Sequence, residues 1–142
     1  MAEVVTVLNY TRGILSNFNS LTILVTNPFT FPILEWGHFV PPGTQFIEIN
    51  CCIGYRLLAG TPPTTITFSV SENGSTSPIG RGQQSQNTID ERGLMNLKII
   101  IDSPETGVHN FYRLNPEVET LGATYDIIGP VTVDTISYGI PT

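Results

Sequence analysis

The chain has 142 residues, a formal net charge of −6 at pH 7 and only 13% charged residues. This length fits one domain, residues 1–142, which can bury a core without disulfides or metals. The six basic residues are scattered singly, which argues against nucleic acid as a partner. No apolar run approaches the roughly 20 residues of a membrane-spanning helix. Low charge with positive mean hydropathy therefore favours self-association.

The N-terminal third begins with two short apolar segments. The first ten residues, MAEVVTVLNY, lack a basic region ahead of an apolar block, so we expect no secretory signal. Alternation predicts strands over residues 4–10 and 21–26. Residues 29–40 are aromatic and apolar, but Pro28 and Pro32 cannot donate to a strand ladder. We therefore expect an edge strand or an irregular covering segment there.

Residues 45–57, QFIEINCCIGYRL, form the longest period-two run in the chain. The odd positions are nearly all apolar and the even positions mostly polar, which predicts a central strand with one buried face. The preceding Pro41-Pro42-Gly43-Thr44 places proline and glycine at the two central positions of a type II turn. The chain is therefore expected to turn sharply and enter this strand.

The middle of the chain changes composition after one further strand. Ile66, Phe68 and Val70 alternate with Thr and Ser and predict a strand. Residues 71–93 contain only Ile79 and Ile89 as large apolar residues. Such a segment cannot bury enough apolar surface to order itself as a core element. We therefore expect a mobile polar loop, an extended arm, or a segment that becomes ordered on a partner.

The last third of the chain is again predicted to form strands. Residues 94–101 alternate, and residues 108–114 are predicted to pair with them as a hairpin. Residues 117–122 could hold one helical turn, and residues 123–128 and 131–138 form two final strands. The total is about eight or nine antiparallel strands with almost no helix. The predicted fold is an all-β, single-domain β-sandwich or jelly-roll-like barrel.

Two adjacent cysteines lie in the central strand. Neighbouring residues on a strand point to opposite faces, so Cys51 is expected in the core as an inert thiol. Cys52 shares a face with Glu48, Asn50 and Arg56. It is either covered by a second layer or forms an intersubunit contact or disulfide. A nucleophilic role would need an activating base, and no histidine is near in sequence.

The sequence carries no catalytic, cofactor or metal motif. Metal-ligand spacings of His and Cys are missing, as are the nucleophile elbow, the phosphate loop and the dinucleotide fingerprint. Glu117 and Glu119 would share one face of a strand, which we interpret as a solvated acidic rim, with calcium as the alternative. We therefore expect a protein that is not an enzyme and binds no cofactor.

Aromatic residues supply the remaining candidates. Four of them precede the central strand and are expected, together with Cys52, at an edge or against another subunit: Phe29, Phe31, Trp36 and Phe39. Three residues could instead stack on a sugar if they lie on end loops: Trp36, Tyr112 and Tyr125.

Three functional hypotheses follow. The first is a non-enzymatic structural subunit that assembles with itself or with another structural subunit, as in a virion decoration, a fibre or a surface appendage. It would then reside in an assembled particle or surface structure. The second is a carbohydrate-binding, lectin-like module. The third is a small membrane-active, pore-forming β protein.

Overall fold

The computed structural model describes residues 5–15, 23–27 and 31–141. These residues form nine β-strands and no helix, so none of their segments is a helix able to cross a membrane. The strands are β1 (Thr6–Leu15), β2 (Ile23–Thr26), β3 (Leu34–Val40), β4 (Thr44–Ala59), β5 (Thr64–Glu72), β6 (Pro78–Gln86), β7 (Arg92–Asp102), β8 (Val108–Val118) and β9 (Thr124–Gly139).

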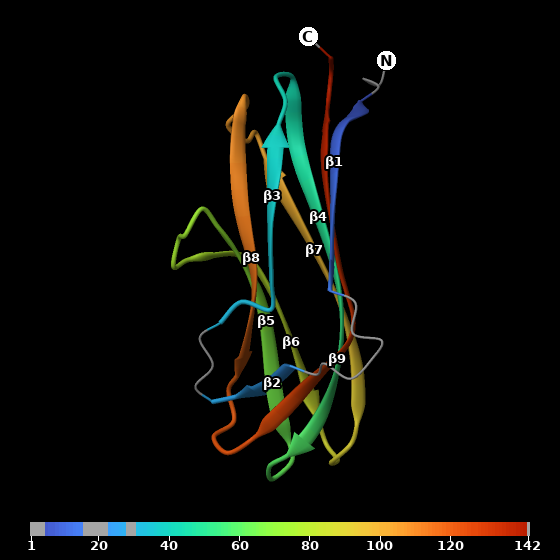
Figure 1. The fold of residues 1–142 in the computed structure, drawn as a ribbon, viewed down its shortest axis with the longest axis vertical. Helices are drawn as coiled ribbons and strands as arrows, with labels where there is room; N and C mark the ends of the chain where they lie inside the picture. The colour runs from blue at the N-terminus through green and yellow to red at the C-terminus, as the bar shows by residue number, and fades with distance from the viewer. Residues whose placement is uncertain (1–4, 16–22, 28–30, 142) are drawn as a thin grey trace.

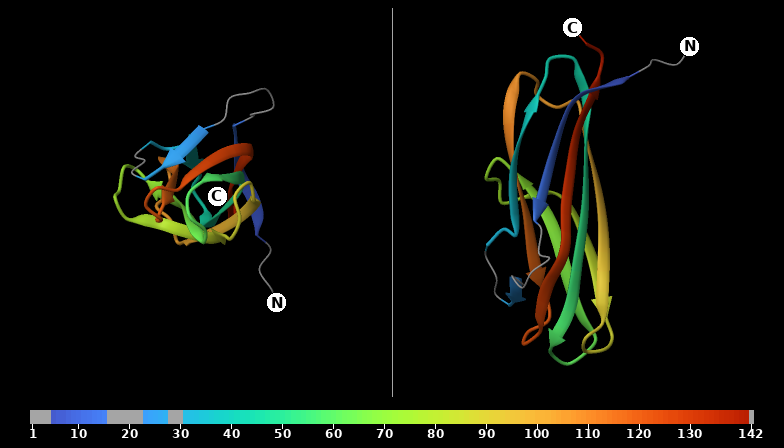
Figure 2. Two further views of the ribbon diagram at one scale, coloured as in Figure 1. Left: turned by 90° about the horizontal axis from the view of Figure 1, so that it is seen from below. Right: turned by 45° about the vertical axis from the view of Figure 1, so that its right-hand side comes forward.

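The nine strands form two antiparallel sheets that face each other (Figure 1). Sheet A has the order β1-β9-β4-β7, and β2 also pairs with β9. Sheet B has the order β3-β8-β5-β6. This distribution of the strands over two facing layers, one of five strands and one of four, is a jelly-roll arrangement, which confirms the predicted fold class. Figure 2 shows the long strands of sheet A side by side and both described chain ends at one end of the molecule.

The predicted central strand is confirmed. β4 lies between β9 and β7, and its odd positions from Ile47 to Leu57 are buried while most even positions are partly exposed. The turn before it is also as predicted, because Thr44 N donates to Pro41 O at 3.2 Å and Gly43 has φ 90°. Glycine tolerates this positive φ at the third position of a type II turn.

The core fills the space between the sheets. The inward positions of β4, such as Ile47, Ile49 and Ile53, are fully buried. They belong to one hydrophobic cluster with Phe68 from β5 and Leu114 from β8. Alternation along each strand thus supplies one apolar face per sheet, and burying these two faces drives the sheets together.

One strand pairing differs from the sequence-based expectation. β8 does not form a hairpin with β7. It lies in sheet B between β3 and β5. The connection between β7 and β8 crosses from one sheet to the other, so neighbours in sequence are not partners in the ladder. β3 is an edge strand of sheet B, as expected for part of residues 29–40, while residues 28–30 lie outside the described residues.

The C-terminal region forms longer strands than predicted. β8 continues to Val118, and a turn closed by Ala123 N and Thr120 O replaces the expected helical turn. β9 is one strand rather than two, because the register with β4 shifts near Gly129 and Pro130 instead of ending there. A bulge accommodates the missing proline N–H.

The prediction of a mobile loop or arm over residues 71–93 is wrong for residues 78–86. These residues form β6, which pairs with β5 at the edge of sheet B. Its inward positions include Gly80 and Gly82, which lie against Ile99 and Met95 of β7. β6 is therefore ordered by large side chains of the opposite sheet, with few large apolar residues of its own.

Candidate functional site

The outer face of sheet A carries the most distinctive surface in the described part of the chain. Cross-strand register places its side chains in rows over β1, β9, β4 and β7, because directly opposed residues share a face. One row runs from Tyr10 through Ile136 and Glu48 to Ile100. Figure 2, right, shows these four strands spread across the sheet.

One half of this face is apolar. Phe46 stacks on Tyr138, with ring centroids 4.9 Å apart. Three neighbours are about half exposed: Val7 at 55%, Tyr10 at 50% and Ile100 at 47%. We call this group the apolar half, and its members are Val7, Tyr10, Phe46, Ile100, Ile136 and Tyr138. Glu48 lies in the same row, between Ile136 and Ile100. Large apolar side chains gathered on the solvent face of a sheet are characteristic of an interaction site.

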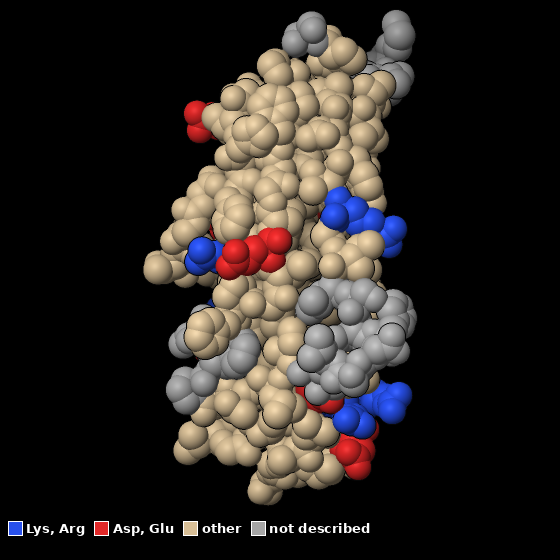
Figure 3. Space-filling view, in the orientation of Figure 1, with Lys and Arg blue, Asp and Glu red and all other residues tan. Residues whose placement is uncertain are grey.

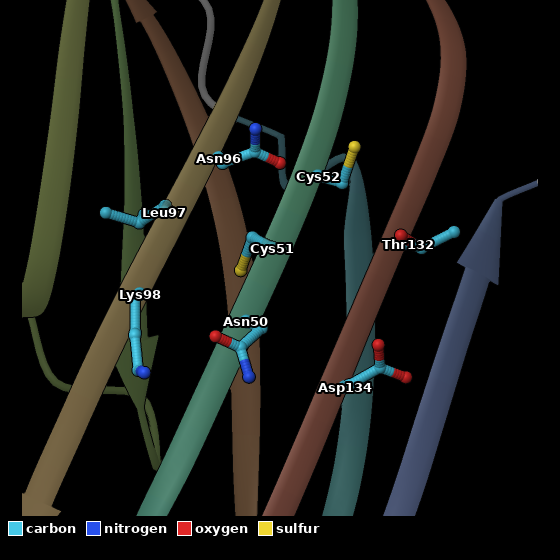
Figure 4. Close-up of a pocket in the computed structure, with 8 residues that line it drawn as sticks. All are labelled: Asn50, Cys51, Cys52, Asn96, Leu97, Lys98, Thr132 and Asp134. Carbon is cyan, nitrogen blue, oxygen red and sulfur yellow. The ribbon is translucent and has the colours of Figure 1, made fainter.

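The other half of the face is polar and shallowly hollowed, with a volume of about 400 Å³. Its charges are paired: Arg12 Nε lies 3.6 Å from Asp134 Oδ1, and Lys98 Nζ lies 3.6 Å from Glu48 Oε1. Tyr10 OH also donates to Asp134, which raises the pKa of Tyr10. We call this region the polar half, and Figure 4 shows its lining residues.

The two cysteines lie as the alternation predicted. Cys51 is 2% exposed and Cys52 is partly exposed in the polar half. Burial raises the pKa of the Cys51 thiol to about 12, so this thiol stays protonated at neutral pH. Cys52 lies between Asn96 of β7 and Thr132 of β9 (Figure 4). It remains a candidate intersubunit contact within the polar half, separated from the apolar half by the row of Asn50, Lys98 and Asp134.

The aromatic residues predicted as intersubunit contacts do not come together. Trp36 is 6% exposed, so its prediction as a surface contact is wrong. Phe39 is 36% exposed on the outer face of sheet B, where its ring lies 4.9 Å from that of His109. Phe31 is 71% exposed ahead of β3, and Phe29 lies outside the described residues.

The prediction that Trp36, Tyr112 and Tyr125 stack on a sugar is also wrong. Tyr112 and Tyr125 are fully buried, and their hydroxyl groups are hydrogen-bonded inside the molecule. Trp36 packs on Tyr112 with ring centroids 5.7 Å apart. These rings belong to the core because large amphipathic aromatics are readily buried when their polar atoms find partners.

The interior contains one pair that resembles catalytic machinery. Ser137 Oγ lies next to His38 Nε2, as in a nucleophile and its base. Both residues are at most 1% exposed, so a substrate has no access to them. Among the described residues, no group of three or more His, Cys, Asp or Glu side chains could hold a metal ion. Glu117 and Glu119, for which calcium was the alternative, therefore have no third carboxylate, His or Cys beside them among these residues.

Comparison with known proteins supports the architecture. No protein-family model and no curated protein sequence matches this chain. Among solved structures, it is similar to Eiger TNF from S. frugiperda, with a TM-score of 0.55 and 10% sequence identity. The match covers 90% of this chain and 92% of that chain. At this identity the likeness shows the jelly-roll fold alone.

Sequence reasoning missed most of the apolar half, although the signal was present. Ile100 interrupts the polar positions of its strand, and Ile136 and Tyr138 do the same in β9. Apolar residues at positions that alternation assigns to solvent are the signature of a covered outer face. Three of the aromatic residues that the sequence offered as candidates, Trp36, Tyr112 and Tyr125, belong to the core instead.

Proposed function

We propose that the protein is a non-enzymatic structural subunit that assembles with copies of itself through the outer face of sheet A. The observation that carries this proposal is the apolar half, in which Phe46 stacks on Tyr138 beside the half-exposed Val7, Tyr10 and Ile100. Burying such side chains against a partner removes apolar surface from water and stabilises the complex.

The size of the face suits a second copy of the chain. Four strands over the register shared by β4 and β7 span about 700 Å², taking strand spacing and rise at their usual values. A standard stable interface buries about 800 Å² on each partner. The outer face of sheet A therefore has nearly the area that one half of such an interface requires, with the apolar half as its energetic core and the polar half and the Leu94 end as its rim.

The charges on this face also allow the outer faces of two copies to meet. The whole chain carries −6, so two copies repel each other at long range. On this face, Arg12 and Lys98 balance Asp134 and Glu48, Arg56 balances Asp126, and Asp102 and Arg92 lie at opposite ends of β7. The surface in view in Figure 3 also carries its charged side chains in a few small groups. Two copies can thus approach through sheet A with little local repulsion.

The particle type expected from the sequence is a virion decoration, a fibre or a surface appendage. The test is size-exclusion chromatography with light scattering from micromolar to millimolar concentration, followed by negative-stain microscopy of the same fractions. Discrete oligomers, fibres or larger particles support the proposal. A uniform 15.5 kDa monomer at every concentration would contradict it.

A further inference from the structure

A second surface, on the opposite sheet, has the features of a ligand site. A polar groove of about 410 Å³ runs over β8, β5 and β6 on the outer face of sheet B. Ser69 and Ser71 of β5 form its floor, between Asn115 and Arg113 of β8 and Arg81 of β6. The loop between β5 and β6, which stands out from the sheet in Figure 1, closes one side.

Two arginine side chains line this groove, Arg81 and Arg113, and the Arg113 guanidinium also lies 5.7 Å from the centre of the Phe111 ring. Arg81 is exposed and forms no ion pair or hydrogen bond with the described residues. Arg113 lies on the far side of β5, and its Nε is 3.4 Å from Glu35 Oε1. Because one strand separates β6 from β8, the two backbones are about 10 Å apart. Guanidinium groups bind carboxylate and sulfate groups in forked, charge-assisted geometry.

The groove also contains neutral hydrogen-bonding groups with free capacity. Asn115 Nδ2 donates to Ser71 Oγ at 3.2 Å, so the Ser71 hydroxyl proton remains available as a donor. Asn115 Oδ1 and Ser69 Oγ have no hydrogen-bond partner among the described residues. Glu117 adds a carboxylate acceptor at the same groove.

This combination of two arginines, neutral hydrogen-bonding groups and one carboxylate fits one class of ligand. A bare inorganic anion would gain from Arg81 and Arg113 but would be repelled by Glu117. A ligand with both acidic groups and hydroxyls satisfies the guanidinium groups and donates to the acceptors. We propose that the groove binds a short acidic saccharide, whose carboxylate or sulfate groups bind Arg81 and Arg113. Its hydroxyls bind the remaining polar groups, which are Ser69, Ser71, Asn115 and Glu117.

The proposal is tested by calorimetric titration with a trimer of galacturonic acid, a sulfated hexasaccharide and neutral maltohexaose. We expect at least one acidic saccharide to bind and maltohexaose not to bind, and the preferred acid identifies carboxylate or sulfate as the recognised group. Arg81→Gln should weaken binding about tenfold or more. Arg81 is exposed, so this variant should keep the wild-type melting temperature and oligomeric state.

Arg92→Gln is the matched control, because Arg92 is an exposed arginine on β7 of the other sheet and its loss changes the net charge equally. It should leave the affinity unchanged. The proposal fails if neither acidic saccharide binds or if maltohexaose binds as well as they do. It also fails if both variants lose affinity equally, or if inorganic sulfate displaces the saccharide at equal concentration.

Discussion

Ser137 Oγ of sheet A lies 2.7 Å from His38 Nε2 of sheet B, in the interior between the sheets. Thr11 Oγ1 lies 2.8 Å from the other ring nitrogen. A neutral imidazole has one donor and one acceptor nitrogen, and a hydroxyl can serve either. Two hydroxyls therefore satisfy the neutral ring completely, and His38 ties the two sheets together.

This arrangement predicts a loss of stability in acid. Burial lowers the pKa of His38 from 6.5 to about 4. Between these values the unfolded chain binds more protons, so the stabilisation is complete above pH 6.5 and is lost as the pH falls towards 4. We expect the free energy of unfolding in urea to fall by about 2 kcal/mol between pH 7 and pH 4.5 from this group.

The control for the acid effect is the other histidine. His109 is exposed on β8, so His109→Gln should keep the wild-type pH dependence. His38→Gln should flatten the dependence over the same range, whatever its effect on stability at pH 7. An unchanged slope in His38→Gln would show that other groups cause the acid effect.

The core position of Trp36 predicts a second stability effect. Its indole Nε1 donates to Thr135 Oγ1 at 2.8 Å in the buried space between the sheets. Thr135→Val removes the acceptor and leaves the N–H unpaired, at a cost of about 1–3 kcal/mol in unfolding free energy. Thr132→Val, on the outer face of the same strand, should change it by less than about 0.5 kcal/mol. Equal effects in urea denaturation would contradict the buried bond.

The order of β6 can be tested at Gly80. A Cβ there would lie 2.5 Å from Ile99 Cγ1, so Gly80→Ala overpacks the core and should destabilise by about 1–3 kcal/mol. In a mobile loop the same change would be neutral or slightly stabilising, because alanine restricts the unfolded chain. Combining it with Ile99→Ala should cost less than the sum of the single changes. Additive costs in denaturation would argue against this contact.

The two cysteines should differ in reactivity. We expect one maleimide adduct per native chain by mass spectrometry, at Cys52, because Cys51 is buried with its pKa raised to about 12. Cys51→Ser should keep the adduct and Cys52→Ser should lose it. A covalent dimer formed on oxidation should likewise require Cys52. Two adducts on the folded protein would contradict the burial of Cys51.

The sequence predicts elements whose inward positions are filled by their own apolar side chains. β4 is such an element, because Ile47, Ile49 and Ile53 indicate its buried face without any knowledge of the neighbouring strands. β6 is the opposite case. Gly80 and Gly82 form an inward face only because Ile99 and Met95 of the other sheet occupy the space above them. This packing is a tertiary contact between two sheets, so the local sequence pattern of β6 does not predict it.

The same distinction between local pattern and tertiary contact applies to strand pairing and to the candidate site. Adjacent strands were expected to pair, yet β8 joins β3 and β5, because crossovers between sheets depend on the whole arrangement. In the site, the faces of Cys51 and Cys52 followed from alternation alone. The apolar half required register between strands, because Ile136 and Ile100 lie in one row only after β9 and β7 have both paired with β4.

Light scattering on two variants of one strand tests most directly whether the apolar half mediates assembly. Ile100 and Leu94 both lie on the outer face of β7, with exposures of 47% and 53%, but Leu94 is about 20 Å away, beside Gly54. Ile100→Lys should convert the oligomer to a 15.5 kDa monomer, and Leu94→Lys should leave it assembled. An oligomer that persists in Ile100→Lys, or is lost equally in both variants, would contradict assembly through this surface.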